Sequence, residues 1–199
     1  MESWGIGVTG DPLSFDDLFA DAADAEHREV VLDIGFGSGE ALIELAELRS
    51  HECIIGIDVH TPGVAAVLEA VQRRGLRNVR VVEGDVLELL QRIPQRSLAA
   101  IRVFFPDPWP KRRQRGRRLI RPDVIEQLVP LLRLGGTLHL ATDVDDYAAQ
   151  MEAVCDAPAL AGGVIERPMW RPVTRYEQRA IDEGRRPVEL LYTVTQTVD

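Results

Sequence analysis

The chain has 199 residues, 45% of them hydrophobic, and a formal net charge of −9. This size and composition are typical of one globular domain with a sizeable core, and no apolar run is long enough to span a membrane. The opening segment lacks the basic and apolar regions of a signal peptide. Cys53 and Cys155 show no CxxC spacing, and the four histidines show no metal-ligand spacing. We therefore expect a cytoplasmic protein without a disulfide framework, membrane anchor or structural metal.

Residues 1–26 are polar and acidic and are expected to form a loosely ordered lead-in to a single domain over residues 27–199. Within that domain, short apolar or β-branched runs predict seven strands. They are Glu29–Ile34, Cys53–Ile57, Val79–Val82, Ala99–Phe105, Thr137–Ala141, Gly163–Arg167 and Glu189–Thr197. Apolar residues at helical spacing lie between them, at 41–45, 64–71 and 125–132. This alternation predicts an α/β fold with a mostly parallel sheet, helices on both faces and a terminal antiparallel hairpin.

The first chemical motif is LDIGFGSGE, residues 32–40. Gly35, Gly37 and Gly39 follow a strand that ends in Asp33, and glycine suits a turn whose backbone approaches a ligand closely. The GxGxG spacing differs from the dinucleotide pattern GxGxxG. A tight strand-to-helix turn without a ligand is an equally good interpretation of the glycines alone.

Two more acids follow the next two predicted strands. Asp58 is placed to accept hydrogen bonds from ribose hydroxyls. Asp85 is placed to accept from an adenine amino group, although a helix N-cap explains it as well. Three carboxylates at the carboxyl ends of successive parallel strands favour a positively charged adenosyl ligand. S-adenosylmethionine fits this requirement better than NAD.

The segment FFPDPWPKRRQRGRRLIR, residues 104–121, opposes the acidic character of the chain. Two prolines flank Asp107 and stiffen its loop, and seven of the eleven residues from Lys111 to Arg121 are basic. A solvated charged face is the simpler interpretation of that run. Its density beside an aromatic loop favours contacts with nucleic-acid phosphates. Trp109 is interpreted either as a base-stacking residue or as a core anchor.

With these motifs, the chain resembles the bacterial tRNA (guanine-N7)-methyltransferases, which are class I S-adenosylmethionine-dependent enzymes. The resemblance covers roughly residues 28–192. It rests on LDIGFGSGE, GIDVHTPGV, FFPDPWPKRR with RRLI, LHLATDVDDYA and RPVTRYEQR. It implies a Rossmann-like methyltransferase fold with a seven-stranded sheet, S-adenosylmethionine as methyl donor, and methylation of a guanine N7 in the variable loop of tRNA. Monomer and homodimer both remain open.

The resemblance also implies roles for individual residues. Asp33, Asp58 and Asp85 would contact the cofactor together with Gly35, Gly37 and Gly39, and Asp107 would be the catalytic acid. Substrate-binding positions would be Lys111, Asp143, Thr174, Arg175, Tyr176 and Glu177. Without the resemblance, Asp143 would be interpreted equally well as a helix cap, and Thr174 with Glu177 as a capping box.

The chain departs from the family pattern at Gln114–Gly116 and at Ala180–Pro187, where histidines are usual. Three rival functions remain: a small-molecule methyltransferase, an RNA-binding module that holds S-adenosylmethionine without turnover, and a dehydrogenase. The dense arginines disfavour the first and intact Asp107 and Lys111 disfavour the second. The glycine spacing, with no plausible hydride-transfer site, disfavours the third.

Overall fold

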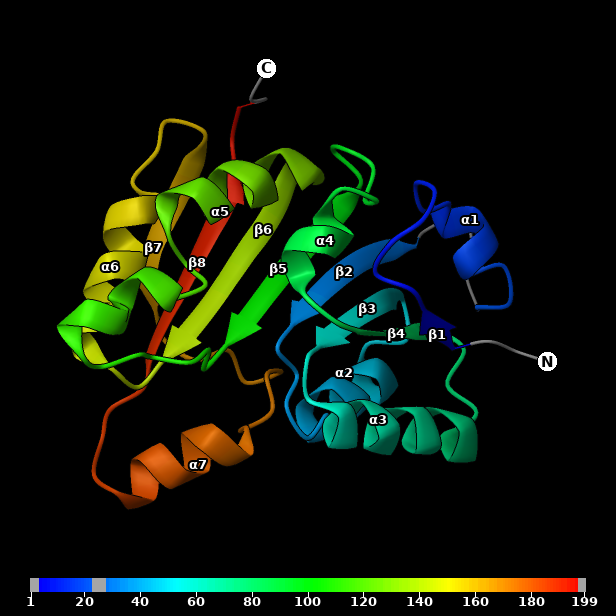
Figure 1. The fold of residues 1–199 in the computed structure, drawn as a ribbon, viewed down its shortest axis with the longest axis horizontal. Coiled ribbons are helices and arrows are strands. Elements are labelled where there is room, and N and C mark those ends of the chain that lie inside the picture. The colour runs from blue at the N-terminus through cyan, green and yellow to red at the C-terminus, as the bar shows by residue number, and fades with distance from the viewer. Residues whose placement is uncertain (1–3, 23–27, 197–199) are drawn as a thin grey trace.

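The structure is a computed structural model that describes residues 4–22 and 28–196 (Figure 1). Its strands are β1 Gly5–Ile6, β2 Glu29–Ile34, β3 Glu52–Asp58, β4 Val79–Glu83, β5 Leu98–Phe104, β6 Leu132–Thr142, β7 Leu160–Ile165 and β8 Val188–Val194. Its α-helices are α1 Phe15–Leu18, α2 Glu40–Leu48, α3 Thr61–Arg74, α4 Val86–Leu90, α5 Pro122–Leu128, α6 Asp145–Cys155 and α7 Arg175–Asp182. Two short 3₁₀ helices are η2 Arg112–Arg117 and η3 Val129–Leu131.

The strands form one sheet in the order β1-β4-β3-β2-β5-β6-β8-β7. Every pair from β1 to β6 is parallel, whereas β8 runs antiparallel to both β6 and β7. The predicted mostly parallel sheet with its terminal antiparallel hairpin is therefore confirmed. The predicted strand number was one too low, because β1 has only two residues and carries no apolar pattern. After β4 the chain returns to the other side of β2, so β2 and β5 flank the switch in strand order.

Helices cover both faces of the sheet, as predicted. On one face α2 and α3 bury Leu45 and Val67 against Ile54 of β3. On the other, α4, α5 and α6 lie across β5, β6 and β8 (Figure 1) and share a larger core with them. Burial of these apolar stripes is the main favourable term for folding. Among the described residues, no helix is both long and apolar enough to cross a membrane.

The predicted lead-in, residues 1–26, is described only over residues 4–22, and residues 1–3 and 23–26 lie outside the described residues. In the described part, β1 pairs with β4, and Leu13 and Phe19 are buried in the larger core. Arg92 donates from Nε to the carbonyl of Asp11 at 2.8 Å. The two buried side chains are isolated apolar residues that the polar composition of the segment conceals, and the other contacts are made by its backbone.

The helical pattern over residues 125–132 ends earlier than predicted. Helix α5 stops at Leu128, a 3₁₀ turn follows, and β6 begins at Leu132. Pro130 lies in that turn, where it has no N–H to continue an α-helical hydrogen-bond ladder.

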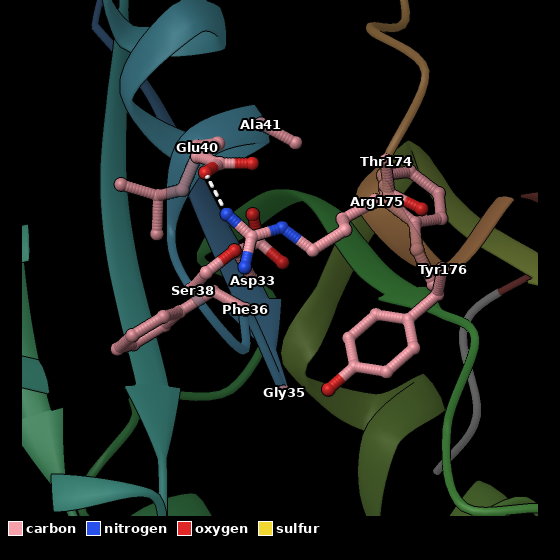
Figure 2. Close-up of a pocket in the computed structure, with 11 residues that line it drawn as sticks. Asp33, Gly35, Phe36, Ser38, Glu40, Ala41, Thr174, Arg175 and Tyr176 are labelled. Carbon is pink, nitrogen blue, oxygen red and sulfur yellow. Dashed lines mark hydrogen bonds and ion pairs between the residues drawn. The ribbon is translucent and has the colours of Figure 1, made fainter. Parts of the chain in front are cut away.

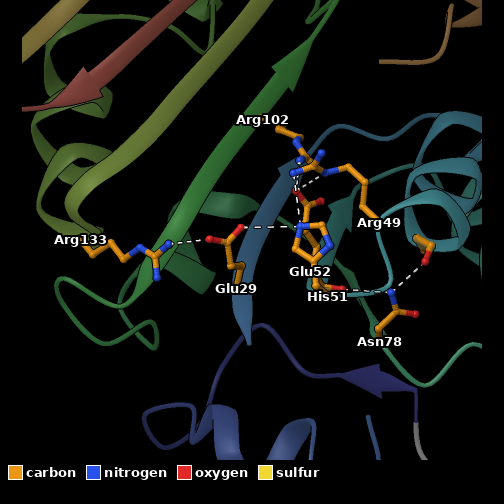
Figure 3. Close-up of polar contacts among 8 residues, drawn as sticks. Glu29, Arg49, His51, Glu52, Asn78, Arg102 and Arg133 are labelled. Atoms are coloured by element: carbon orange, nitrogen blue, oxygen red, sulfur yellow. Dashed lines mark hydrogen bonds and ion pairs between the residues drawn. The ribbon is translucent and has the colours of Figure 1, made fainter. Parts of the chain in front are cut away.

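A polar cluster lies at the start of β2 and β3 (Figure 3). Ligand atoms of Glu29, His51 and Glu52 lie within 4.8 Å of one another, a spacing that a metal ion could use. Their carboxylates are instead paired with three arginines: Arg133 with Glu29, and Arg49 and Arg102 with Glu52. Three guanidinium groups compete with any cation for these oxygens, so the cluster gives no reason to place a metal there.

Candidate active site

A pocket lies outside the carboxyl ends of β2 and β5, between the glycine turn and α7 (Figure 2). Its lining residues are Asp33, Gly35, Phe36, Ser38, Glu40, Ala41, Leu42, Phe104, Thr174, Arg175 and Tyr176. Arg175 reaches across the pocket and donates to Glu40 at 2.5 Å. Open α/β sheets bind ligands where the strand order switches, and the pocket occupies that position.

The glycine turn and the start of α3 fit into each other. Gly37 and Gly39 have φ of 60° and 76°, values that favour glycine. The backbone N–H of Gly37 donates to Asp58 Oδ2 at 2.6 Å. A Cβ added at Gly63 would lie 1.9 Å from the carbonyl oxygen of Gly37. The motifs LDIGFGSGE and GIDVHTPGV are thus packing partners, and this explains the glycine at position 63.

Asp33 is only 5% exposed at the end of β2. Burial raises the pKa of its carboxyl from 3.8 to about 6, the neighbouring Arg102 opposes this rise, and the charges of Glu52 and Asp58 add to it. Such a raised pKa means that the fold disfavours the ionised form. A carboxylate held at this cost beside a pocket is suited to a cationic ligand.

Asp58 is the last residue of β3, which neighbours β2, and Asp85 follows β4, which lies on the far side of β3. Asp58 accepts hydrogen bonds from Gly37 and from the N–H of His60, the latter at 2.8 Å. Asp85 is the N-cap of α4 and accepts from Leu87 N–H at 2.9 Å. The helix-cap interpretation of Asp85 is therefore correct. The pocket of Figure 2 includes Asp33 but neither of these two acids in its lining.

The loop after β5 carries Asp107, which is exposed. Phe105 and Trp109, two residues to either side, have φ of 53° and 40°, values that cost side-chain-bearing residues conformational energy. The guanidinium of Arg117 lies 5.0 Å from the centroid of the Trp109 ring. Trp109 therefore stacks on a cation of the basic run and remains half-buried.

The basic run divides into two groups. Lys111, Arg112 and Arg113 are exposed, and within the described residues they have no ion-pair partner. Others are paired: Arg115 and Arg118 with Asp146, and Arg121 with Asp123. The prediction that the arginines as a group hold phosphates is wrong for Arg118, because its side chain is only 1% exposed.

Helix α7 begins at the pocket. Thr174 caps it by accepting from the N–H of Glu177 at 3.0 Å, so the capping interpretation of Thr174 is correct. The ring of Tyr176 faces Gly37, because a Cβ added at Gly37 would lie 3.3 Å from a carbon of that ring. The carboxylate of Glu177 is 3% exposed and accepts from Arg171 at 2.7 Å. Arg175 and Tyr176 therefore face the pocket mouth, whereas Glu177 points into the protein.

Arg171 was not predicted as a site residue, yet it joins α7 to β8 and to the end of β5. Its side chain is fully buried and donates to both carboxylate oxygens of Glu189 at 2.6 and 2.7 Å. Its guanidinium lies 5.0 Å from the Phe104 ring centroid. Burial alone would raise the pKa of Glu189, but hydrogen bonds from His139 and Arg171 hold it below the usual range. In the sequence, the only indication of a role for Arg171 was its position at the start of the motif RPVTRYEQR.

Asp143, at the end of β6, forms an ion pair with Arg185. It does not cap α6, whose N-cap position is Val144. Arg185 belongs to Ala180–Pro187, where the chain departs from the family pattern. The structure therefore joins a predicted substrate position to a residue of that segment.

Similarity to known proteins places the chain in a family. A family described as "Putative methyltransferase" matches residues 27–190. A tRNA (guanine-N(7)-)-methyltransferase of Streptomyces avermitilis is 39% identical, over 98% of this chain and 68% of the relative. The enzyme of the same name from Aeromonas hydrophila is 39% identical, over 94% of this chain and 80% of the relative. The one from Thiobacillus denitrificans is 44% identical, over 88% of this chain and 79% of the relative. The chain belongs to the tRNA (guanine-N(7)-)-methyltransferase family.

Solved structures agree with this membership at the level of the fold. An rRNA methylase from Streptococcus thermophilus has a TM-score of 0.60 at 15% identity, covering 92% of this chain and 95% of that one. The antibiotic-resistance methyltransferase Kmr also has a TM-score of 0.60, at 17% identity, and the match covers 96% of this chain and 97% of that one. The predicted methyltransferase fold and family are confirmed. In this family member the pocket, the glycine turn and the Asp107 loop lie at one edge of the sheet.

Proposed function

We propose that this protein transfers the methyl group of S-adenosylmethionine to N7 of a guanine in tRNA, in the variable loop. One observation carries the proposal. The pocket at the β2–β5 switch has the glycine turn and a buried carboxylate on one side, and the segment that leads into the Asp107 loop and the basic run on the other. Relatives that share most of this chain carry the name of this activity.

The residues at the glycine turn fit a cationic adenosyl ligand. A Cβ added at Gly35 would meet no atom within 4 Å, which leaves the turn open for close approach. Asp33 would face a positively charged group, Asp58 the ribose hydroxyls and Asp85 the adenine amino group. Gly37 and Gly39 would let the backbone follow the ligand.

S-adenosylmethionine supplies an electrophilic methyl group that the N7 lone pair takes while the electron pair of the S–CH₃ bond stays on sulfur. Guanine N7 carries no proton, so the protein needs no general base and acts mainly by orientation. The guanine becomes cationic as the new N–C bond forms. The exposed carboxylate of Asp107 would stabilise that charge.

On the RNA side, N7 lies in the deep and narrow major groove of A-form helices, so the guanine has to be presented from a loop. Lys111 with Arg112 and Arg113 would hold phosphates around it. Arg175 and Tyr176, at the pocket mouth, would contact the nucleotide, and Thr174 would fix their helix. Asp143 would reach the substrate through its partner Arg185, whereas Glu177 would act only by holding the buried Arg171 in place.

The test is methyl transfer from labelled S-adenosylmethionine to an unmodified tRNA pool, with digestion to identify the labelled nucleoside. We expect label in 7-methylguanosine, and a loss of about 100-fold or more in rate for Asp107→Asn, with Glu126→Gln as an exposed control. Near-normal turnover by Asp107→Asn would end the charge role. No label in any RNA, with cofactor binding intact, would favour the small-molecule and binding-module functions instead.

A further inference from the structure

We propose that Arg118 is a positioning residue that fixes the backbone of the Asp107 loop; this inference rests on the proposed function. Arg118 lies in the basic run, where the sequence favours a phosphate contact. Its side chain is instead 1% exposed. A guanidinium so far from water requires partners for its donors.

The first partner is the loop itself. Arg118 Nε donates to the carbonyl oxygen of Pro108 at 2.8 Å, and Pro108 is the residue immediately after Asp107. The other partners belong to α6. Nη2 donates to Asp146 Oδ2 at 2.7 Å and Nη1 to Gln150 Oε1 at 2.9 Å. The planar guanidinium group of Arg118 therefore joins the loop to the first two turns of α6.

The backbone next to Arg118 is held by the same helix. The hydroxyl of Tyr147 accepts from the N–H of Ile120 at 3.0 Å, and Gln150 Nε2 donates to the carbonyl of Ile120 at 2.8 Å. The guanidinium of Arg118 also lies 4.6 Å from the Tyr147 ring centroid. The anchor from which Arg118 reaches the loop is thus itself fixed on α6.

The loop needs such an anchor. Phe105 and Trp109 hold positive φ, a conformation that persists only where the surroundings enforce it. In the described part of the chain, the carboxylate of Asp107 has no hydrogen-bond partner that would place it. The position of the Asp107 carboxylate therefore depends on the loop backbone, and Arg118 donates a hydrogen bond to that backbone one residue away, at Pro108.

Two kinds of arginine therefore lie in one basic run. A phosphate contact would affect tRNA affinity and its salt dependence, whereas a positioning residue would affect the rate of methyl transfer once tRNA is bound. The experiment measures both for Arg118→Lys, Asp146→Asn, Arg113→Ala and Arg115→Ala. Single-turnover rates at saturating tRNA, tRNA Kd from low to moderate KCl, S-adenosylmethionine binding and Tm are recorded for each.

For Arg118→Lys we expect a rate about 100-fold lower, because a lysine cannot bond to the loop and to α6 together and a small displacement of the loop is costly. The tRNA Kd and its salt dependence should stay within twofold of wild type. Asp146→Asn should show the same pattern more weakly. Arg115→Ala, which removes only the exposed partner of Asp146, should keep the wild-type rate. Arg113→Ala should weaken tRNA binding and reduce its salt dependence.

An Arg118→Lys variant with the wild-type rate, or with the binding defect of Arg113→Ala, would overturn the inference. A lower Tm with an unchanged rate would also overturn it, since that result means a purely structural role. If Arg118→Lys does not fold, Asp146→Asn decides in the same way. Absence of 7-methylguanosine with the wild-type protein would refute the proposed function itself, whereas an active wild type with a normal Arg118→Lys refutes only the positioning role.

Discussion

At the residue scale, the proposed ligand-binding role of Asp33 comes with a cost in stability. Its pKa is about 6 in the folded protein against an ordinary 3.8, so folding favours the protonated form. The free energy of unfolding therefore falls as the pH rises through this window, and stays lower above it. A difference of about 2 pKa units corresponds to about 3 kcal/mol.

We predict that Asp33→Asn raises Tm at pH 7.5, that this gain shrinks toward pH 4, and that S-adenosylmethionine binding is lost. Thermal denaturation from pH 4 to 8 and calorimetric titration measure the two effects. Glu126→Gln, at an exposed carboxylate outside the pocket lining, is the control and should change neither Tm nor S-adenosylmethionine binding. An Asp33→Asn protein that is less stable than wild type at every pH would contradict the burial argument.

At the element scale, the turn after β2 and the start of α3 depend on each other. We predict that Gly63→Ala weakens S-adenosylmethionine binding at least tenfold, because its Cβ would lie 1.9 Å from the Gly37 carbonyl oxygen. The fold should lose about 1–3 kcal/mol, as overpacked sites do. Calorimetry and urea denaturation test this, with Gly116→Ala as control, since a Cβ there meets no atom within 4 Å. Unchanged cofactor affinity in Gly63→Ala would show that the turn tolerates displacement.

Helix α7 is tied to the sheet through Glu177 and Arg171. We predict that Glu177→Gln lowers the free energy of unfolding by about 1–3 kcal/mol, because the buried Arg171 loses one charged partner. Urea denaturation measures this, and Glu183→Gln is the control because surface pairs contribute little. If Glu177 instead reads the guanine directly, kcat/KM would fall in Glu177→Gln while stability stays unchanged.

The sequence predicted what local pattern determines. The β-branched runs located β2 to β6, and an acid beside each of the first three strand ends placed Asp33, Asp58 and Asp85 along one edge of the sheet. The burial of Arg118 could not be predicted from the sequence, because its partners Asp146 and Gln150 lie 28 and 32 residues away. A run of arginines by itself indicates a solvated face. The ion pair of Glu177 with Arg171 was concealed for a different reason: a TxxE spacing explains the same residue as a cap.

At the scale of the whole molecule, a protein of net charge −9 is proposed to hold RNA with few cations. We predict that log Kd for tRNA rises steeply with log salt, and that Arg112→Ala with Arg113→Ala reduces the slope by about 1.5. Filter binding from low to moderate KCl measures it. Arg121→Ala is the control, because that side chain already pairs with Asp123. A slope unchanged in the double variant would place the RNA elsewhere.

The order of the strands has a consequence for how the enzyme could change. Strands β1 to β4 carry the proposed donor-binding turns, and β5 to β8, with the segments that join them, carry Asp107, the basic run and α7. Among the described strands, the two sets pair only between β2 and β5, and outside the sheet Arg175 and Tyr176 of the second set contact Glu40 and Gly37 of the first. Both departures from the family pattern fall in the second set. A change of RNA substrate that keeps Arg175, Tyr176 and the β2–β5 pairing can therefore arise in the second set while the proposed donor-binding turns stay unchanged.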